Sequence, residues 1–277
     1  MLFSEFISPN LRGVYSSLMN YFVGIGGLTT NCLQLALFNQ QKIFYLIFFP
    51  SIVSGVFSTL VCLFVKESQN VKQTAKAEKN VKLESIWQRK YAKCFVIALA
   101  LGCSTPGSGI NSIMNYSTIT FKSLFDSPTS AAYGGVIIQA IVAISASVSL
   151  FFVRKINRKT LILVGVIGML LGQTFLIVVD LAVKTLPTLW FVISGSVLFI
   201  FSQQMSYGPL CFVLAAEVYP TIVKTRFVNI TMVMFWFVII VLTFIYPLLQ
   251  YSANYSIYVV LTLLSGTILL KFLPETR

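Results

Sequence analysis

Long apolar stretches alternate with short polar ones along the whole of this 277-residue chain. Each apolar stretch is longer than the roughly 20 residues that a helix needs to cross a bilayer. None shows the alternation of a half-buried strand or the single apolar face of a soluble helix, and the few charges inside them, such as Asp180, lie near their ends. The pattern predicts an all-α polytopic membrane protein with about eight transmembrane helices, at residues 13–37, 43–65, 94–121, 131–153, 160–183, 188–216, 227–250 and 252–273.

Composition and charge support this prediction. The chain is 57% hydrophobic and only 10% charged, with a mean hydropathy of +0.85, whereas a soluble domain carries about a quarter charged residues. The net charge is +12, and the basic residues are distributed along the chain as a membrane topology requires. If the N-terminus is cytoplasmic, only Lys42, Lys122 and Lys184 lie outside and the other 17 of the 20 cations lie inside. This bias predicts cytoplasmic termini, and it favours contact with membrane lipid over nucleic acid.

The residue inventory argues against metal, cofactor and enzyme chemistry. The chain has no histidine, and its five cysteines form no CxxC pair, so they are expected to be small packing residues. Asp180 and Glu217 are the acids nearest the apolar stretches, and neither has a nucleophile and base beside it. We expect no cofactor, no metal and no enzymatic activity.

A two-helix unit with the same polar flanks occurs twice. In each copy an acid precedes a base by seven residues, two apolar stretches follow, and a further acid closes the unit. The residues are Glu5, Arg12 and Glu67 in the first copy, and Glu217, Lys224, Arg226 and Glu275 in the second. Such repeats are typical of membrane transporters. With Arg158 and Lys159, Glu217 can form an ion-pair cluster; the alternative is an exposed salt bridge worth at most about 1 kcal/mol.

Polar side chains inside the spans are the candidate contacts of a solute. The third stretch is interrupted by Pro106, Gly107 and Gly109, and Asn111 and Asn115 follow. Broken helices at membrane depth occur where protein or a water-filled cavity surrounds them, and substrate sites lie beside such breaks. Asn111 is therefore the leading candidate; the alternative is that it caps a packed kink. Two further candidates are Gln204, just before Gly208-Pro209, and Asn20, whose alternative role is an interhelical hydrogen bond.

Five motifs in order resemble the sugar porter family of the major facilitator superfamily, which includes the facilitative glucose transporters. They are SPNLRG, GSGIN, NRKTLILVGVIGM, YGPLCFVLAAEVYPTIVKTR and LPETR. The resemblance implies a partial major facilitator fold: the last two helices of the N-terminal bundle at 1–65, a basic cytoplasmic linker at 66–93 and a complete six-helix C-terminal bundle at 94–277. Because four family helices precede the first matching motif, we expect a truncated chain.

The resemblance also implies a function, the transport of a hexose-like sugar by alternating access. It adds Trp236 to the expected solute contacts and gives the Glu217 cluster the role of a cytoplasmic gate. Some polar and aromatic positions of the family are altered here, which leaves fewer groups to bind a hydroxylated ligand; they are Thr105, Pro106, Val142, Phe212 and Phe235. The alternative is a non-transporting protein, either a pseudo-transporter remnant, a sensor or a partner-binding membrane subunit.

Overall fold

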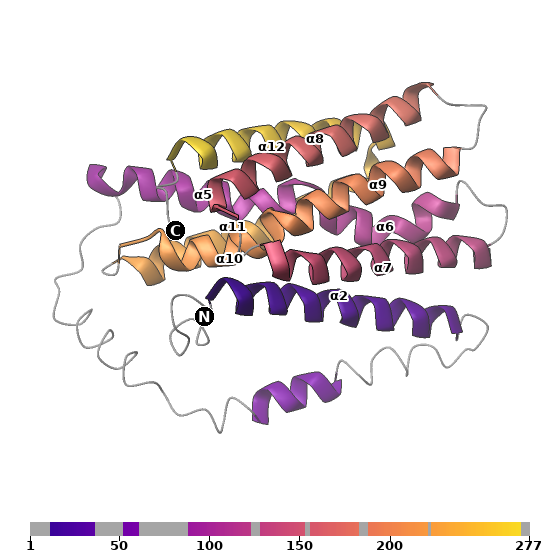
Figure 1. Ribbon diagram of the computed structural model, residues 1–277, viewed down its shortest axis with the longest axis horizontal. Helices are drawn as coiled ribbons and strands as arrows, with labels where there is room; N and C mark the ends of the chain where they lie inside the picture. The colour runs from indigo at the N-terminus through magenta and orange to yellow at the C-terminus, as the bar shows by residue number, and fades with distance from the viewer. Residues whose placement is uncertain are drawn as a thin grey trace.

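The computed structural model describes residues 12–36, 52–60, 88–122, 128–152, 156–182, 188–220 and 223–272. Residues 52–60 are helical. Figure 1 shows the long helices side by side along one direction, with α2 next to α7. The elements are α2 (Arg12–Ala36), η2 (Arg89–Tyr91), α5 (Ala92–Gly107), α6 (Ile110–Lys122), α7 (Pro128–Phe152), α8 (Arg158–Ala182), α9 (Thr188–Met205), α10 (Tyr207–Glu217), α11 (Lys224–Ile245), η3 (Tyr246–Leu248) and α12 (Tyr251–Phe272).

The helices confirm the predicted all-α membrane fold. Within the described residues, six helical stretches are long and apolar enough to cross a membrane: Arg89–Tyr116, Tyr133–Phe152, Arg158–Leu181, Phe191–Ala215, Lys224–Leu248 and Tyr251–Phe272. They match the last six predicted spans, and α2 coincides with the first. Of the second predicted span, only residues 52–60 are described.

Two of the predicted spans are each divided into two helices. The third contains α5 and α6, with Ser108 and Gly109 between them, and the sixth contains α9 and α10, with Ser206 between them. Proline lies close to both interruptions. Because proline has no N–H, Pro106 cannot donate to the carbonyl of Gly102, nor Pro209 to that of Met205, the last residue of α9. The predicted break of the third span is confirmed, and the sixth proves to be broken as well.

Small residues bring α8 and α9 into close contact. A Cβ atom added to any of three α8 glycines would overlap a residue of α9 or the turn after it; the pairs are Gly165 with Ser206, Gly168 with Ser202, and Gly172 with Phe199. Small residues at helix interfaces let backbones approach closely in membranes. The close α8–α9 contact fixes α8 against the end of α9, where the second break begins.

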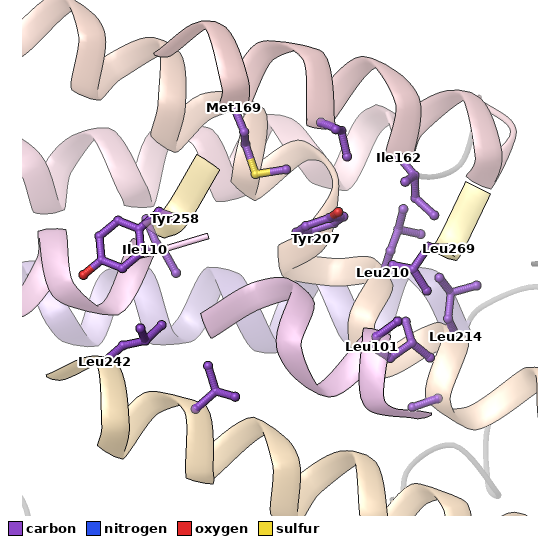
Figure 2. Packing of buried hydrophobic residues seen from close by; sticks show 14 of the residues in the cluster. Leu101, Ile110, Ile162, Met169, Tyr207, Leu210, Leu214, Leu242, Tyr258 and Leu269 are labelled. Atoms are coloured by element: carbon purple, nitrogen blue, oxygen red, sulfur yellow. The ribbon is translucent and has the colours of Figure 1, made fainter. Parts of the chain in front are cut away.

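A shared core joins the helices around the breaks. Figure 2 shows Leu101 of α5 near Leu210 and Leu214 of α10, and Leu269 of α12 lies in the same region. All four side chains are 1% exposed. This packing holds α5, α10 and α12 together, so α5 and α10, each of which borders one of the two breaks, share one buried apolar core.

Candidate functional site

The break between α5 and α6 has a backbone that suits glycine. The N–H of Ser108 donates to the carbonyl of Ser104 at 3.3 Å, and that of Gly109 to the carbonyl of Pro106 at 3.0 Å. Gly109 then has φ +84, in the left-handed region. A side chain at this position would also overlap the ring of Tyr258 from α12. Conformation and contact therefore both require glycine here.

The two breaks are bonded to each other. Thr105 Oγ1 of α5 donates to the carbonyl oxygen of Tyr207 at 3.1 Å, and Tyr207 is the first residue of α10. Cys211 Sγ of α10 donates to the carbonyl of Leu101 at 3.2 Å. Buried carbonyls in a membrane protein need such partners, because lipid offers none. Thr105, which the sequence predicts to be a lost solute contact, thus has a structural role in bonding the two interrupted helices to each other.

A polar cluster joins the second break to α2. A Cβ atom added to Gly208 would lie 2.8 Å from Gln204 Oε1 and 3.0 Å from Asn20 Nδ2, so both side chains border Gly208. Asn20 Nδ2 is buried and has no hydrogen-bond partner among the described residues. Asn111 Nδ2, two residues after Gly109, is likewise buried and unpaired within the described part of the chain. Two amide donors are thus available to an oxygen acceptor close to the breaks.

The other two expected solute contacts lie at more open positions. Asn115 is exposed on α6. Trp236 on α11 is 60% exposed and meets the ring of Phe235 edge-on, with centroids 5.7 Å apart. Phe235 in turn lies 5.7 Å from Phe212 of α10. The structure therefore connects Trp236 to α10 through a row of aromatic rings, whereas Asn20 and Gln204 both border Gly208 of α10.

An ion pair joins the start of α8 to the end of α10. Arg158 Nη2 donates to Glu217 Oε1 at 3.1 Å, and Arg158 Nη1 contacts Glu217 Oε2, which makes the pair bidentate. Their side chains are 18% and 15% exposed. Each charge sits at the unfavourable end of its own helix, a cation at an N-terminus and an acid at a C-terminus. Pairing offsets both penalties.

The other members of the predicted gate are half-buried or lie outside the described residues. Lys159, Lys224 and Arg226 are half-buried. The side chain of Arg12 and all of Glu5, Glu67 and Glu275 lie outside the described residues, so their membership stays a prediction.

Sequence reasoning missed a second set of polar residues, in the interior of the helix bundle. Tyr258, Thr262 and Ser265 form a stripe on α12 with spacings of four and three residues, and all three are buried. Ser265 lies 3.2 Å from the hydroxyl of Tyr207, and Thr262 contacts Gln173 of α8 at 3.3 Å. The helical spacing of these hydroxyls within the predicted span 252–273 was the available signal.

The comparisons with known proteins identify the family. The model of the family described as "Sugar (and other) transporter" matches residues 67–277. The chain belongs to this family, the sugar porter family of the major facilitator superfamily. With its membrane-spanning helices, it is an integral membrane protein.

Individual relatives are distant and longer than this chain. The major myo-inositol transporter IolT of Bacillus subtilis is 25% identical over 219 residues, which cover 77% of this chain and 45% of the relative. The glucose transporter GlcP of Staphylococcus epidermidis is 26% identical over 173 residues (61% and 39%). The D-xylose-proton symporter of Escherichia coli K12 is 24% identical over 192 residues (66% and 38%). The chain thus spans less than half the length of these relatives.

Solved structures support the fold. A double-tryptophan mutant of XylE superposes with a TM-score of 0.80 at 19% identity, over 99% of this chain and 66% of that one. XylE bound to 6-bromo-6-deoxy-D-glucose gives a TM-score of 0.77 at 19% identity, over 97% and 65%. The arrangement of the described helices is therefore that of part of a major facilitator protein.

Proposed function

We propose that this protein carries a hexose-like sugar across a membrane by alternating access. The observation behind the proposal is the pair of buried, unpaired amide donors, Asn20 Nδ2 and Asn111 Nδ2, beside two interrupted helices. A buried donor without a partner costs about 1–3 kcal/mol. A ligand hydroxyl or ring oxygen would remove that cost, and a sugar presents several such oxygens to donors from different helices.

The relatives share one ligand chemistry. Their names give myo-inositol, glucose and xylose, all small, neutral and polyhydroxylated. A neutral ligand fits the described site, where Asn20, Gln204 and Asn111 supply amides rather than charges.

The ion pair gives this proposal a gate. Arg158 and Glu217 hold the ends of α8 and α10 together, and α10 also carries Gly208 of the polar cluster. In our proposal the pair closes the cytoplasmic side and breaks when the site opens there. The basic residues near this end favour that orientation, with both termini cytoplasmic. The proposal keeps the predicted division of the chain into the last two helices of the N-terminal bundle (1–65), a basic cytoplasmic linker (66–93) and a six-helix C-terminal bundle (94–277).

Reconstitution tests the function. Purified protein in liposomes should take up labelled D-glucose, D-xylose or myo-inositol saturably, and unlabelled sugar inside should accelerate exchange. Asn20→Leu should reduce this uptake, whereas Thr29→Val should not, because Thr29 is exposed on the same helix and its hydroxyl donates to the carbonyl of Ile25 in its own helix. Binding without uptake would favour a sensor or partner-binding subunit. Neither binding nor uptake of the three sugars would favour a non-transporting remnant.

A further inference from the structure

Gln173 connects α8 to the break between α5 and α6. Its side chain is fully buried in the middle of α8. Its amide nitrogen donates to the carbonyl oxygen of Ser108 at 2.9 Å and to Thr262 Oγ1 at 3.3 Å. Ser108 lies between α5 and α6, where the helix is interrupted. One side chain therefore holds a carbonyl of the break and a hydroxyl of α12 together.

Tyr258 of α12 supports the same break at the start of α6. Its hydroxyl donates to Ser112 Oγ at 2.8 Å, and its ring covers Gly109. Figure 2 shows Tyr258 beside Ile110, the first residue of α6. The direction in which α6 leaves the break is thus set by contacts from both α8 and α12.

The energetics argue that Gln173 does more than stabilise the fold. Its amide nitrogen satisfies the Ser108 carbonyl, but its own Oε1 is buried and has no partner among the described residues. A buried unpaired polar atom costs about as much as a hydrogen bond to a buried carbonyl contributes. Replacing the amide by an apolar side chain of similar length removes the unpaired Oε1 but leaves the Ser108 carbonyl without this donor, so the two unpaired-atom costs offset and the net loss is about that of one hydrogen bond.

We propose that Gln173 is a positioning residue: it fixes the direction of α6, and through it the location of Asn111, without touching the solute. The inference rests on the proposed function, since Asn111 is there a solute contact. Asn111 lies three residues beyond Ser108, which corresponds to a rise of about 4.5 Å along a helix. A swing of about 10° at the break would move it by about 0.8 Å, enough to weaken a directed hydrogen bond.

Transport kinetics test the proposal. Gln173→Met removes the donor at similar length, and Thr174→Val is the matched control, since Thr174 is exposed on the next position of α8 and bonds its own helix. Gln173→Met should raise KM about fivefold to tenfold, the equivalent of one lost hydrogen bond. Vmax should stay within about twofold and the melting temperature within about 4 °C, because the net loss of stability is only about one hydrogen bond. An unchanged KM would overturn the proposal.

A double mutant separates positioning from general destabilisation. If Gln173 acts through Asn111, then adding Gln173→Met to Asn111→Ala should change KM by less than about twofold further, because neighbours that act together are not additive. Effects that multiply would contradict the proposed route. Should the methionine variant fail to insert, Gln173→Asn, which is one methylene too short to reach Ser108, takes its place.

Hydrogen exchange gives a readout that needs no solute. Gln173→Met should speed amide exchange in the peptide covering residues 108–116, and Thr174→Val should not. Unchanged exchange there would overturn the positioning role even if the protein transports sugar. If the parent protein binds no sugar but its exchange responds as expected, the proposed function fails and the link from Gln173 to the break stands.

Discussion

Breaking the ion pair between Arg158 and Glu217 should reveal a coupling of about 2 kcal/mol. At 3.1 Å and an effective dielectric constant of about 20, the attraction is about 5 kcal/mol. The side chains are only 18% and 15% exposed, so desolvation cancels a large part of that attraction. The remainder, about 2 kcal/mol, is in the range of charge-assisted hydrogen bonds.

The two single variants should differ. Glu217→Gln leaves Arg158 at the positive end of α8 near Lys159 and should cost about 3 kcal/mol. Arg158→Met leaves Glu217 with Lys224 and Arg226 within the same end of the molecule, so its cost should be nearer 2 kcal/mol. The corresponding falls in melting temperature are about 6–12 °C and 4–8 °C.

Thermal unfolding of the parent, both single variants and the double variant in one detergent measures the coupling. The double variant should be about as stable as the worse single variant, because the second change removes a charge that has already lost its partner. A loss equal to the sum of the single losses would refute the reasoning, since it would mean that the two side chains do not interact.

Three further changes have defined outcomes. Gly109→Ala should destabilise the protein by at least about 3 kcal/mol, because alanine is strained in the left-handed region and its Cβ would overlap the ring of Tyr258. Gly26→Ala is the control and should leave the melting temperature within about 2 °C, since no atom of the described residues lies within 4 Å of the added Cβ. Equal effects of the two substitutions would contradict the account of the break. Asn111→Ala should reduce sugar uptake at unchanged membrane expression, and unchanged uptake would remove Asn111 from the site. Asp180→Ala should lower the melting temperature by about 2–4 °C, because Asp180 Oδ2 accepts the N–H of Ser252 at the start of α12 at 3.0 Å; Asp180→Asn keeps an acceptor and should lose less.

Hydropathy was sufficient to predict most of the described fold. A membrane helix must be apolar over about 20 residues whatever it packs against, so spans such as 160–183 could be placed without knowing their neighbours. The break after Pro106 was predictable for a similarly local reason, because proline and glycine act on their own backbone. Pairing of Arg158 with Glu217 was expected from charge and from the repeat, and the structure shows the contact.

Contacts between helices could not be predicted in the same way. A helix that is apolar all round gives no periodicity to tell which face meets which neighbour, so Gln173 offered no sign that it reaches Ser108 from another helix. Thr105 is a second example: the sequence predicted only that it is a lost solute contact and gave no sign that its hydroxyl bonds the Tyr207 carbonyl. Whether Asn20, Asn111, Gln204, Asn115 and Trp236 contact a solute remains a prediction.

Equilibrium binding of labelled D-glucose, D-xylose and myo-inositol to the purified protein tests the central proposal most directly. If the buried amides of Asn20 and Asn111 form a sugar site, at least one of these ligands should bind saturably. Asn20→Leu should then weaken that binding about fivefold or more, the equivalent of one hydrogen bond, and Thr29→Val should leave it unchanged. No saturable binding of any of the three, or equal affinity in parent and Asn20→Leu, would contradict the proposal.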